Sequence, residues 1–142
     1  MKHIKIFEKF STDRLEAKVA QYIKYPGMTF DTDSDNNVAM KINGEYAGEY
    51  RFSGVYNNYI TAEVIFVEPR FKRKGIYTAV IKGAMDYAKT TKNIKGIASY
   101  PFDADGMDIE RSAEANAFWE GMVRKGLAVR KEGDEGPEYF TK

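Results

Sequence analysis

The feature that most constrains the fold is a succession of three segments: an apolar stretch, a basic loop and an amphipathic segment. Residues 59–67 become continuously apolar toward their end, as a central strand does. Residues 75–90 then repeat apolar side chains at helical spacing, on a stripe of Ile76, Ala79, Val80, Gly83, Ala84 and Tyr87. A further strand is predicted at residues 94–102. A strand, a crossover helix and another strand form the centre of an α/β fold.

The loop between the first of these strands and the helix carries four cations, Arg70, Lys72, Arg73 and Lys74, and ends at Gly75. Backbone N–H groups at a helix start lack intrahelical acceptors, and the helix dipole is positive there. This position suits a phosphate or pyrophosphate, and a glycine lets such a ligand approach the backbone. Two other interpretations stay open: a solvated turn with incidental charges, and a patch for a nucleic-acid backbone.

The rest of the chain predicts one mixed α/β domain over residues 1–142, with the order β-α-β-β-β-α-β-α-β-β. Thr12 or Asp13 can cap the first helix, and Asn43-Gly44 fits a type I′ hairpin turn. The expected strands are 3–7, 37–42, 45–52, 59–67, 94–102, 127–132 and 138–140, and the expected helices are 12–25, 75–90 and 112–126.

Composition excludes several classes of function. The chain has 22 Lys and Arg against 21 Asp and Glu, a net charge of +1, whereas binding through nucleic-acid phosphates usually requires a cationic excess. It has no cysteine and one histidine, His3, so thiolate chemistry is excluded and no metal site is expected. No apolar run is long enough for a bilayer and no signal-peptide core is present, so a soluble, cytoplasmic protein is expected.

The residues around the basic loop resemble the central signature of the GNAT N-acetyltransferase superfamily, whose members use acetyl-CoA or related thioesters. That signature runs Val-x-Pro, two residues, then Arg/Gln-x-x-Gly-x-Gly/Ala at a helix start, and Val67, Pro69, Gly75 and Ile76 fall in register. The stretches "INGEYAGEYRF" and "SAEANAFWEGMVRKGLA" resemble further family segments. The similarity covers roughly residues 36–142 and identifies the chain as a divergent small member.

The resemblance implies a site for acetyl-CoA as co-substrate. The backbone amides from Lys72 to Tyr77 would hold the pyrophosphate, and the backbone of Ile65 to Val67 would bind the pantetheine arm as an additional strand. An amide near Ile65 would polarise the thioester carbonyl. The implied cofactor-binding residues are Ile65, Phe66, Val67, Lys72, Arg73, Lys74, Gly75, Ile76, Tyr77, Ser112 and Trp119. For Val67 and Ile76 core packing is the alternative, and the two roles are compatible.

The chain departs from the family pattern at four of these positions. Lys72 stands where Arg or Gln is usual, so the charge is kept but planar hydrogen bonding is lost. Tyr77 replaces a small residue, so its side chain is expected to point away from the pyrophosphate. Trp119 occupies the position of a tyrosine that many members use as general acid, and an indole N–H cannot take that part. Ser112 falls at an asparagine position.

Two residues are predicted to be catalytic. Glu63 interrupts an apolar strand where some members carry a carboxylate near the acceptor, which suits a general base. The alternative interpretation of Glu63 is a glutamate that forms a salt bridge or faces the edge of the sheet. Tyr100, on the strand that should flank the thioester, is the candidate for the missing acid, and a buried core tyrosine is its alternative.

The predicted activity is transfer of an acetyl group from acetyl-CoA to an amine by direct attack. The acidic loop 30–37, with Glu45 and Glu49, favours a cationic acceptor, either a small molecule or a protein amine. That loop fails the calcium pattern because Asn36 and Ile42 stand where glycine and glutamate are required. The hairpin tyrosines 46, 50, 56 and 59 suit acceptor stacking or a homodimer contact.

Two alternative functions stay open. One is a non-catalytic binding or inhibitor protein on the same fold, favoured by Lys72, Tyr77 and Trp119. The other is a modifier of nucleic acid, which the near-neutral charge disfavours and the basic loop supports.

Overall fold

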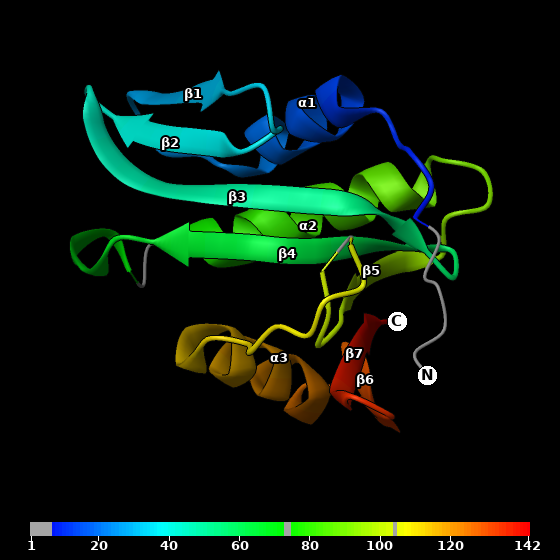
Figure 1. Ribbon diagram of the computed structural model, residues 1–142. Helices are drawn as coiled ribbons and strands as arrows, with labels where there is room; N and C mark the ends of the chain where they lie inside the picture. Colours follow the sequence, from blue (N-terminus) through cyan, green and yellow to red (C-terminus); the bar gives the residue numbers. More distant parts are fainter. Residues whose placement is uncertain (1–6, 73–74, 104) are drawn as a thin grey trace.

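The computed structural model describes residues 7–72, 75–103 and 105–142, which form a mixed α/β fold (Figure 1). The helices are α1 (Thr12–Tyr22), α2 (Ile76–Lys89) and α3 (Ala113–Arg124), with a short 3₁₀ turn at Pro69–Phe71. The strands are β1 (Met28–Thr32), β2 (Val38–Ile42), β3 (Glu45–Tyr56), β4 (Tyr59–Val67), β5 (Gly96–Ser99), β6 (Ala128–Gly133) and β7 (Gly136–Thr141). They make one seven-stranded sheet in the order β1-β2-β3-β4-β5-β7-β6.

The sheet is an antiparallel meander joined to a crossover unit. Strands β1 to β4 pair antiparallel in chain order, while β5 lies parallel to β4 after the crossover through α2. The turn between β2 and β3 has positive φ at Asn43 (52°) and Gly44 (83°), as a type I′ turn requires. The turn between β3 and β4 has positive φ at Asn57 (51°) and Asn58 (69°). These short turns place β2 beside β3 and β3 beside β4.

Two helices lie side by side on one face of the sheet, with α2 behind β3 and β4 and α1 at the level of β1 and β2 (Figure 1). They approach closely because Gly83 of α2 lies directly against the backbone of Val19 in α1. The core between the helices and the sheet contains both aliphatic and aromatic side chains, and its fully buried aliphatic members include Leu15, Val19, Ile60, Val80 and Ile97.

Helix α3 lies apart from this pair, beside the hairpin of β6 and β7 (Figure 1). Its Trp119 is 1% exposed and stacks on Tyr139 of β7, with ring centroids 6.0 Å apart. No helix within the described ranges is long and apolar enough to cross a membrane.

Several local details differ from the sequence-based expectation. The predicted strand at residues 3–7 lies outside the described residues except for Phe7, and Glu8 forms an isolated bridge with Val55. Strand β1 was not predicted, because its run Met-Thr-Phe-Asp-Thr is short and ends in polar residues. The cap of α1 is Ser11, whose Oγ accepts the Arg14 N–H at 3.3 Å, rather than Thr12 or Asp13.

The contact between α1 and α2 predicts that Gly83→Ala destabilises the fold. A Cβ at position 83 would collide with Cα of Val19, and backbone cannot move aside as a side-chain end can. We expect a loss of about 1–3 kcal/mol in the free energy of unfolding, measured by urea denaturation. The control is Gly121→Ala in α3, where the nearest atom is the end of Arg124 at 3.8 Å. That change should be neutral or stabilise by up to ~1 kcal/mol. Equal stability of the two variants would contradict the packing described.

Candidate functional site

A cavity opens where β4 and β5 separate. The two strands pair only at Tyr59↔Gly96, Ile60↔Ile97 and Thr61↔Ala98, so the β4 edge beyond Thr61 has no strand on that side within the part of the chain that the structure describes. We call the adjoining cavity of about 380 Å³ the strand cleft. Its walls are the β4 residues 62–66, Ser99 at the end of β5, Tyr100 after it, residues 109–112, and Tyr77, Glu114, Ala115 and Trp119. Six predicted site residues therefore share one cavity with Tyr77: Glu63, Ile65, Phe66, Tyr100, Ser112 and Trp119.

Glu63 occupies a β-bulge in this wall. Arg51 pairs with Val64 and Phe52 pairs with Ala62, which leaves Glu63 as the extra residue of β4. Its side chain is 15% exposed, and Oε1 lies 3.9 Å from Arg51 Nη1. Its Oε2 is buried and has no hydrogen-bond partner among the described residues. A buried carboxylate oxygen without a donor, at the wall of a cavity, can accept a hydrogen bond from a ligand.

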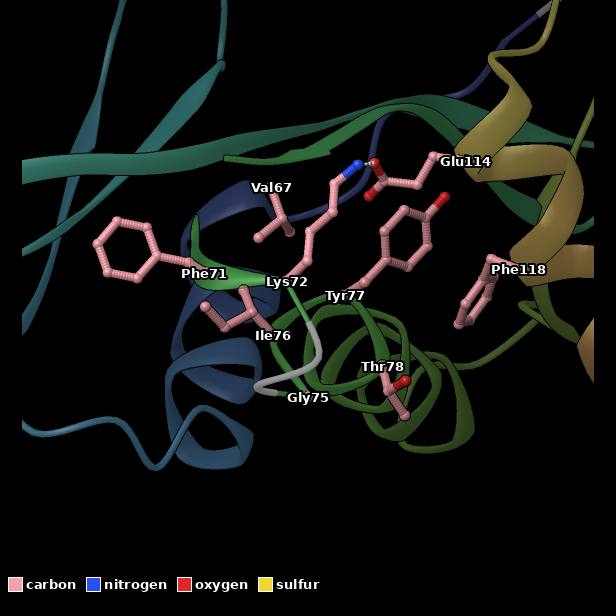
Figure 2. Close-up of a pocket in the computed structure, with 9 residues that line it drawn as sticks. All are labelled: Val67, Phe71, Lys72, Gly75, Ile76, Tyr77, Thr78, Glu114 and Phe118. Atoms are coloured by element: carbon pink, nitrogen blue, oxygen red, sulfur yellow. Dashed lines mark ion pairs between the residues drawn. The ribbon is translucent and has the colours of Figure 1, made fainter. Parts of the chain in front are cut away.

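A second cavity adjoins the strand cleft at the start of α2 (Figure 2). This loop pocket has a volume of about 230 Å³ and is lined by Val67, Phe71, Lys72, Gly75, Ile76, Tyr77, Thr78, Glu114 and Phe118. Gly75 precedes the helix with φ of 76°, and space is open where its Cβ would stand. The first-turn amides of α2 have no intrahelical acceptor by position, so an anion can bind there. The predicted site residues Arg73 and Lys74 lie outside the described residues.

Two contacts with α3, one from the loop before α2 and one from α2 itself, separate the loop pocket from the strand cleft. Lys72 Nζ forms an ion pair with Glu114 Oε2 at 2.7 Å, and the ring of Tyr77 packs on Phe118 with centroids 4.4 Å apart (Figure 2). We call this pair of contacts the clasp. Tyr77 and Glu114 line both cavities. Burial raises the pKa of the Tyr77 hydroxyl well above its ordinary value, and the Glu114 carboxylate raises it further.

Tyr100 lines the strand cleft, but its hydroxyl already donates a hydrogen bond within the protein. The side chain is 3% exposed, and Oη donates to the carbonyl oxygen of Tyr56 at 3.2 Å. Its ring stacks on Phe102 at 4.8 Å within a second, aromatic cluster. Burial raises the pKa of this hydroxyl as well, so it is protonated at neutral pH.

Ser112 and Trp119 are held by local structure. Ser112 is the N-cap of α3, and its Oγ accepts the Ala115 N–H at 3.1 Å. Trp119 is fixed between Phe118 and Tyr139. Both residues face the strand cleft from α3.

Arg111 is a cleft residue that the sequence analysis missed. Its Nε donates to Ser99 Oγ at 2.7 Å, and its Nη2 donates to the carbonyl oxygens of Ser99 (3.1 Å) and Pro137 (2.9 Å). The guanidinium also lies 4.8 Å from the ring centre of Tyr139, and burial lowers its pKa. It thus ties the wall of the strand cleft to β5 and β7. No local pattern could identify it, because its partners are 12 and 26 residues away.

Several of the acidic residues that were expected to attract a cationic acceptor already bond to other groups of the protein. Glu45 pairs with Arg70 at 3.1 Å, and Glu49 accepts from Tyr46 Oη at 3.0 Å. Asp33 accepts the backbone N–H groups of Asp35 and Asn37, so it orders its own loop. The described residues contain no group of three acids or histidines that could hold a metal ion. The carboxylates that line the strand cleft are Glu63, Glu110 and Glu114.

Comparison with known proteins identifies the family. The model of the acetyltransferase (GNAT) family matches residues 4–103, which is more than two thirds of the chain. The protein therefore belongs to the GNAT acetyltransferase family. The match includes β4, the basic loop and α2, and it ends before α3. A search of curated proteins found no match.

Two solved structures resemble the chain along nearly its whole length. One is Ard1 from Thermoplasma volcanium, with 14% identity, a TM-score of 0.48 and coverage of 96% of this chain and 95% of the other. The other is an acetyltransferase from Thermus thermophilus, with 10% identity, a TM-score of 0.47 and coverage of 99% of both chains.

The bonds of Arg111 predict that Arg111→Met destabilises the protein. Methionine keeps much of the packing but leaves two partly buried carbonyl oxygens and Ser99 Oγ without their donor. We expect a loss of about 2–4 kcal/mol in the free energy of unfolding, measured by urea denaturation. Arg124→Met, at an exposed position of α3, is the control and should change stability by less than about 0.5 kcal/mol. If both variants lose the same free energy of unfolding, Arg111 does not anchor the wall of the strand cleft.

Proposed function

We propose that this protein is an N-acetyltransferase that moves an acetyl group from acetyl-CoA to an amine by direct attack. The observation that carries the proposal is the unpaired β4 edge in the strand cleft, which lies next to the amides at the start of α2, with Tyr77 and Glu114 lining both cavities. Family membership supports acetyl transfer as the reaction class. The domain is proposed to span residues 1–142, and its location to be cytoplasmic.

The proposed donor site uses backbone more than side chains. The amides at the start of α2, next to Gly75, would bind the pyrophosphate, with Lys72 adding positive charge. The free edge of Ile65 to Val67 would bind the pantetheine arm as a strand adds to a sheet edge. An amide near Ile65 would donate to the thioester carbonyl oxygen as it gains negative charge.

Glu63 is the proposed general base. The acceptor arrives as an ammonium ion and must lose a proton before its nitrogen can attack. The unpartnered Oε2 of Glu63 is suited to take that proton. The nitrogen then bonds to the thioester carbon, the carbon–sulfur bond breaks, and the nitrogen loses a second proton to become the amide. The sulfur leaves as a thiolate that takes up one proton, and the proton released by the nitrogen restores the group that donates it.

Two tyrosines are candidates for donating the proton to the thiolate. The hydroxyl of Tyr100 would have to leave the carbonyl oxygen of Tyr56. The hydroxyl of Tyr77 has no hydrogen-bond partner within the described part of the chain and lines the strand cleft directly. Both hydroxyls carry a proton at neutral pH, and burial raises their pKa values above the ordinary value of a tyrosine.

The acceptor is proposed to be a cationic amine, either small or part of a protein. Three carboxylates, Glu63, Glu110 and Glu114, line the strand cleft against one cation, Arg111. Glu114 is paired with Lys72, so Glu63 and Glu110 are the groups that would attract a positively charged ligand.

A non-catalytic binding protein is the second candidate, favoured by the clasp. The ion pair of Lys72 with Glu114 and the contact of Tyr77 with Phe118 lie between the two cavities that the donor would have to join. Action on nucleic acid is disfavoured, because Arg70 and Lys72 are each paired with a glutamate.

The first test of the donor site is Gly75→Asp against Gly75→Asn. Asp and Asn have the same shape and both tolerate positive φ, so the pair isolates a negative charge at the start of α2. We expect Asp to weaken acetyl-CoA binding by roughly ten-fold or more relative to Asn, measured by calorimetry.

Gly126→Asp controls for charge and backbone strain, because Gly126 has φ of 74° and open space but follows α3. It should leave the affinity unchanged. Wild-type protein that binds no acetyl-CoA at millimolar concentration would refute the donor site and leave the second candidate.

The test of the base is Glu63→Gln, with Glu132→Gln on the exposed hairpin as control. Glutamine keeps the shape of the side chain but cannot take the proton. Acetyl-CoA affinity should stay within about two-fold, while thiol release with the best amine of a panel should fall by roughly 100-fold or more. Unchanged thiol release in Glu63→Gln would remove Glu63 from the mechanism.

A further inference from the structure

Large apolar side chains are exposed on the face of the sheet that is turned away from α1 and α2. Ile65 and Val67 of β4 belong to the core on the helix side. The alternate residues Val64 and Phe66 therefore point to the opposite face, where they are 37% and 38% exposed. In Figure 1, α1 and α2 lie behind the sheet, and no helix of the described ranges lies over β3 on the near side.

Tyr46 of β3 completes this surface, which we call the aromatic patch (Tyr46, Val64 and Phe66). The Tyr46 ring stacks on Phe66, with centroids 6.5 Å apart and planes at 24°. Its hydroxyl donates to Glu49 Oε1 at 3.0 Å, and Glu49 lies directly opposite Phe66 in the strand register. The hydrogen bond and the stacked ring hold Tyr46 in place, although its side chain is 37% exposed.

The other hairpin tyrosines have structural roles. Tyr50 is 2% exposed, and Tyr56 and Tyr59 pack in the second aromatic cluster. Of the four tyrosines for which acceptor stacking was expected, Tyr46 is thus the one whose ring is offered to a ligand. Exposed apolar patches next to a cavity commonly mark a binding surface.

The aromatic patch is continuous with the strand cleft, because Val64 and Phe66 line both. Along β4, Glu63 precedes Val64 by one residue and Phe66 by three, so the middle of the patch lies roughly 7 Å from Glu63. The neighbouring cation, Arg51, is turned toward Glu63 Oε1, with its Nη1 at 3.9 Å. An amine held at Glu63 can therefore extend its carbon chain over an uncharged aromatic surface.

We propose that the acceptor is an amine that carries an aromatic ring a few carbons from its nitrogen, and that the ring binds on the aromatic patch against Phe66 and Tyr46. This inference rests on the proposed function and gives its acceptor a chemical class. A spacer of four carbons spans roughly 6 Å, which matches the separation of the patch from Glu63. Aromatic rings stack favourably on one another in addition to the gain from burying apolar area.

The experiment compares 4-phenylbutylamine with butylamine, which has the same charge and spacer but no ring. Thiol release from acetyl-CoA gives kcat/KM for each amine with wild type, Tyr46→Ala and Tyr22→Ala. Tyr22 is the matched control, because it is 39% exposed and donates to Asp86 at 3.0 Å but lies on α1, behind the sheet (Figure 1). Thermal melting checks that all three proteins are folded.

Wild type should use the aromatic amine with a kcat/KM roughly ten-fold or more above that of butylamine. Tyr46→Ala should lower this ratio to about a third or less of the wild-type ratio, because one wall of the ring site is lost. Tyr22→Ala should keep the wild-type ratio.

A second measurement depends neither on turnover nor on a variant. With CoA bound to the wild type, the phenyl protons of 4-phenylbutylamine should show intermolecular NOEs to the ring protons of Tyr46 or Phe66. They should show none to Tyr22. NOEs to other parts of the protein alone would place the ring elsewhere and overturn the inference.

The kinetic outcomes separate this inference from the proposed function. If wild type uses both amines equally well, or if Tyr46→Ala keeps the wild-type ratio, the ring does not bind on the aromatic patch. Acetyl transfer then stands, and the patch is left for a protein partner or a second copy of the chain. If the wild type neither binds acetyl-CoA nor releases thiol with any amine, the proposed function fails and this inference fails with it.

Discussion

The early separation of β4 from β5 is the constraint on which the rest of the site depends. Strand β4 is paired with β3 as far as Val67 but with β5 only as far as Thr61, so half of one edge is left open inside the fold. Backbone N–H and C=O groups there need partners, because unpaired buried backbone groups cost free energy. A ligand with amides of its own can supply them, and the bulge at Glu63 turns a carboxylate toward the same opening.

The opposite wall of the opening is held by contacts between segments that are distant in sequence. Arg111 bonds to both β5 and β7, and Trp119 is locked against Tyr139, so the segment before α3 is fixed to the sheet. The clasp then joins α3 to the start of α2. Its ion pair is partly exposed and worth about 0–1 kcal/mol, so a donor that competes for Lys72 can displace it at small cost. The cavities are therefore separated by contacts weak enough to rearrange.

Local patterns in the sequence were sufficient for the fold class and for the elements around the basic loop. The apolar run of β4, the stripe of α2 and the Asn43-Gly44 turn each combine a strong periodicity with a specific backbone requirement. Strand β1 was missed because its stability comes from pairing with β2 rather than from its own composition. Arg111 and the clasp were missed because they are tertiary contacts between single charged residues, which carry no spacing signal. The direction of the Tyr77 ring depends in the same way on Phe118, 41 residues away along the chain.

Amide hydrogen exchange by NMR, with and without saturating acetyl-CoA, tests most directly whether the open β4 edge is a ligand site. The account predicts slower exchange for amides of residues 64–67 that do not pair with β3, and for the first turn of α2. Amides of β1 and β2, which lie at the far edge of the sheet, should keep their rates. If acetyl-CoA binds but slows exchange only outside β4 and the start of α2, the donor site described here is wrong.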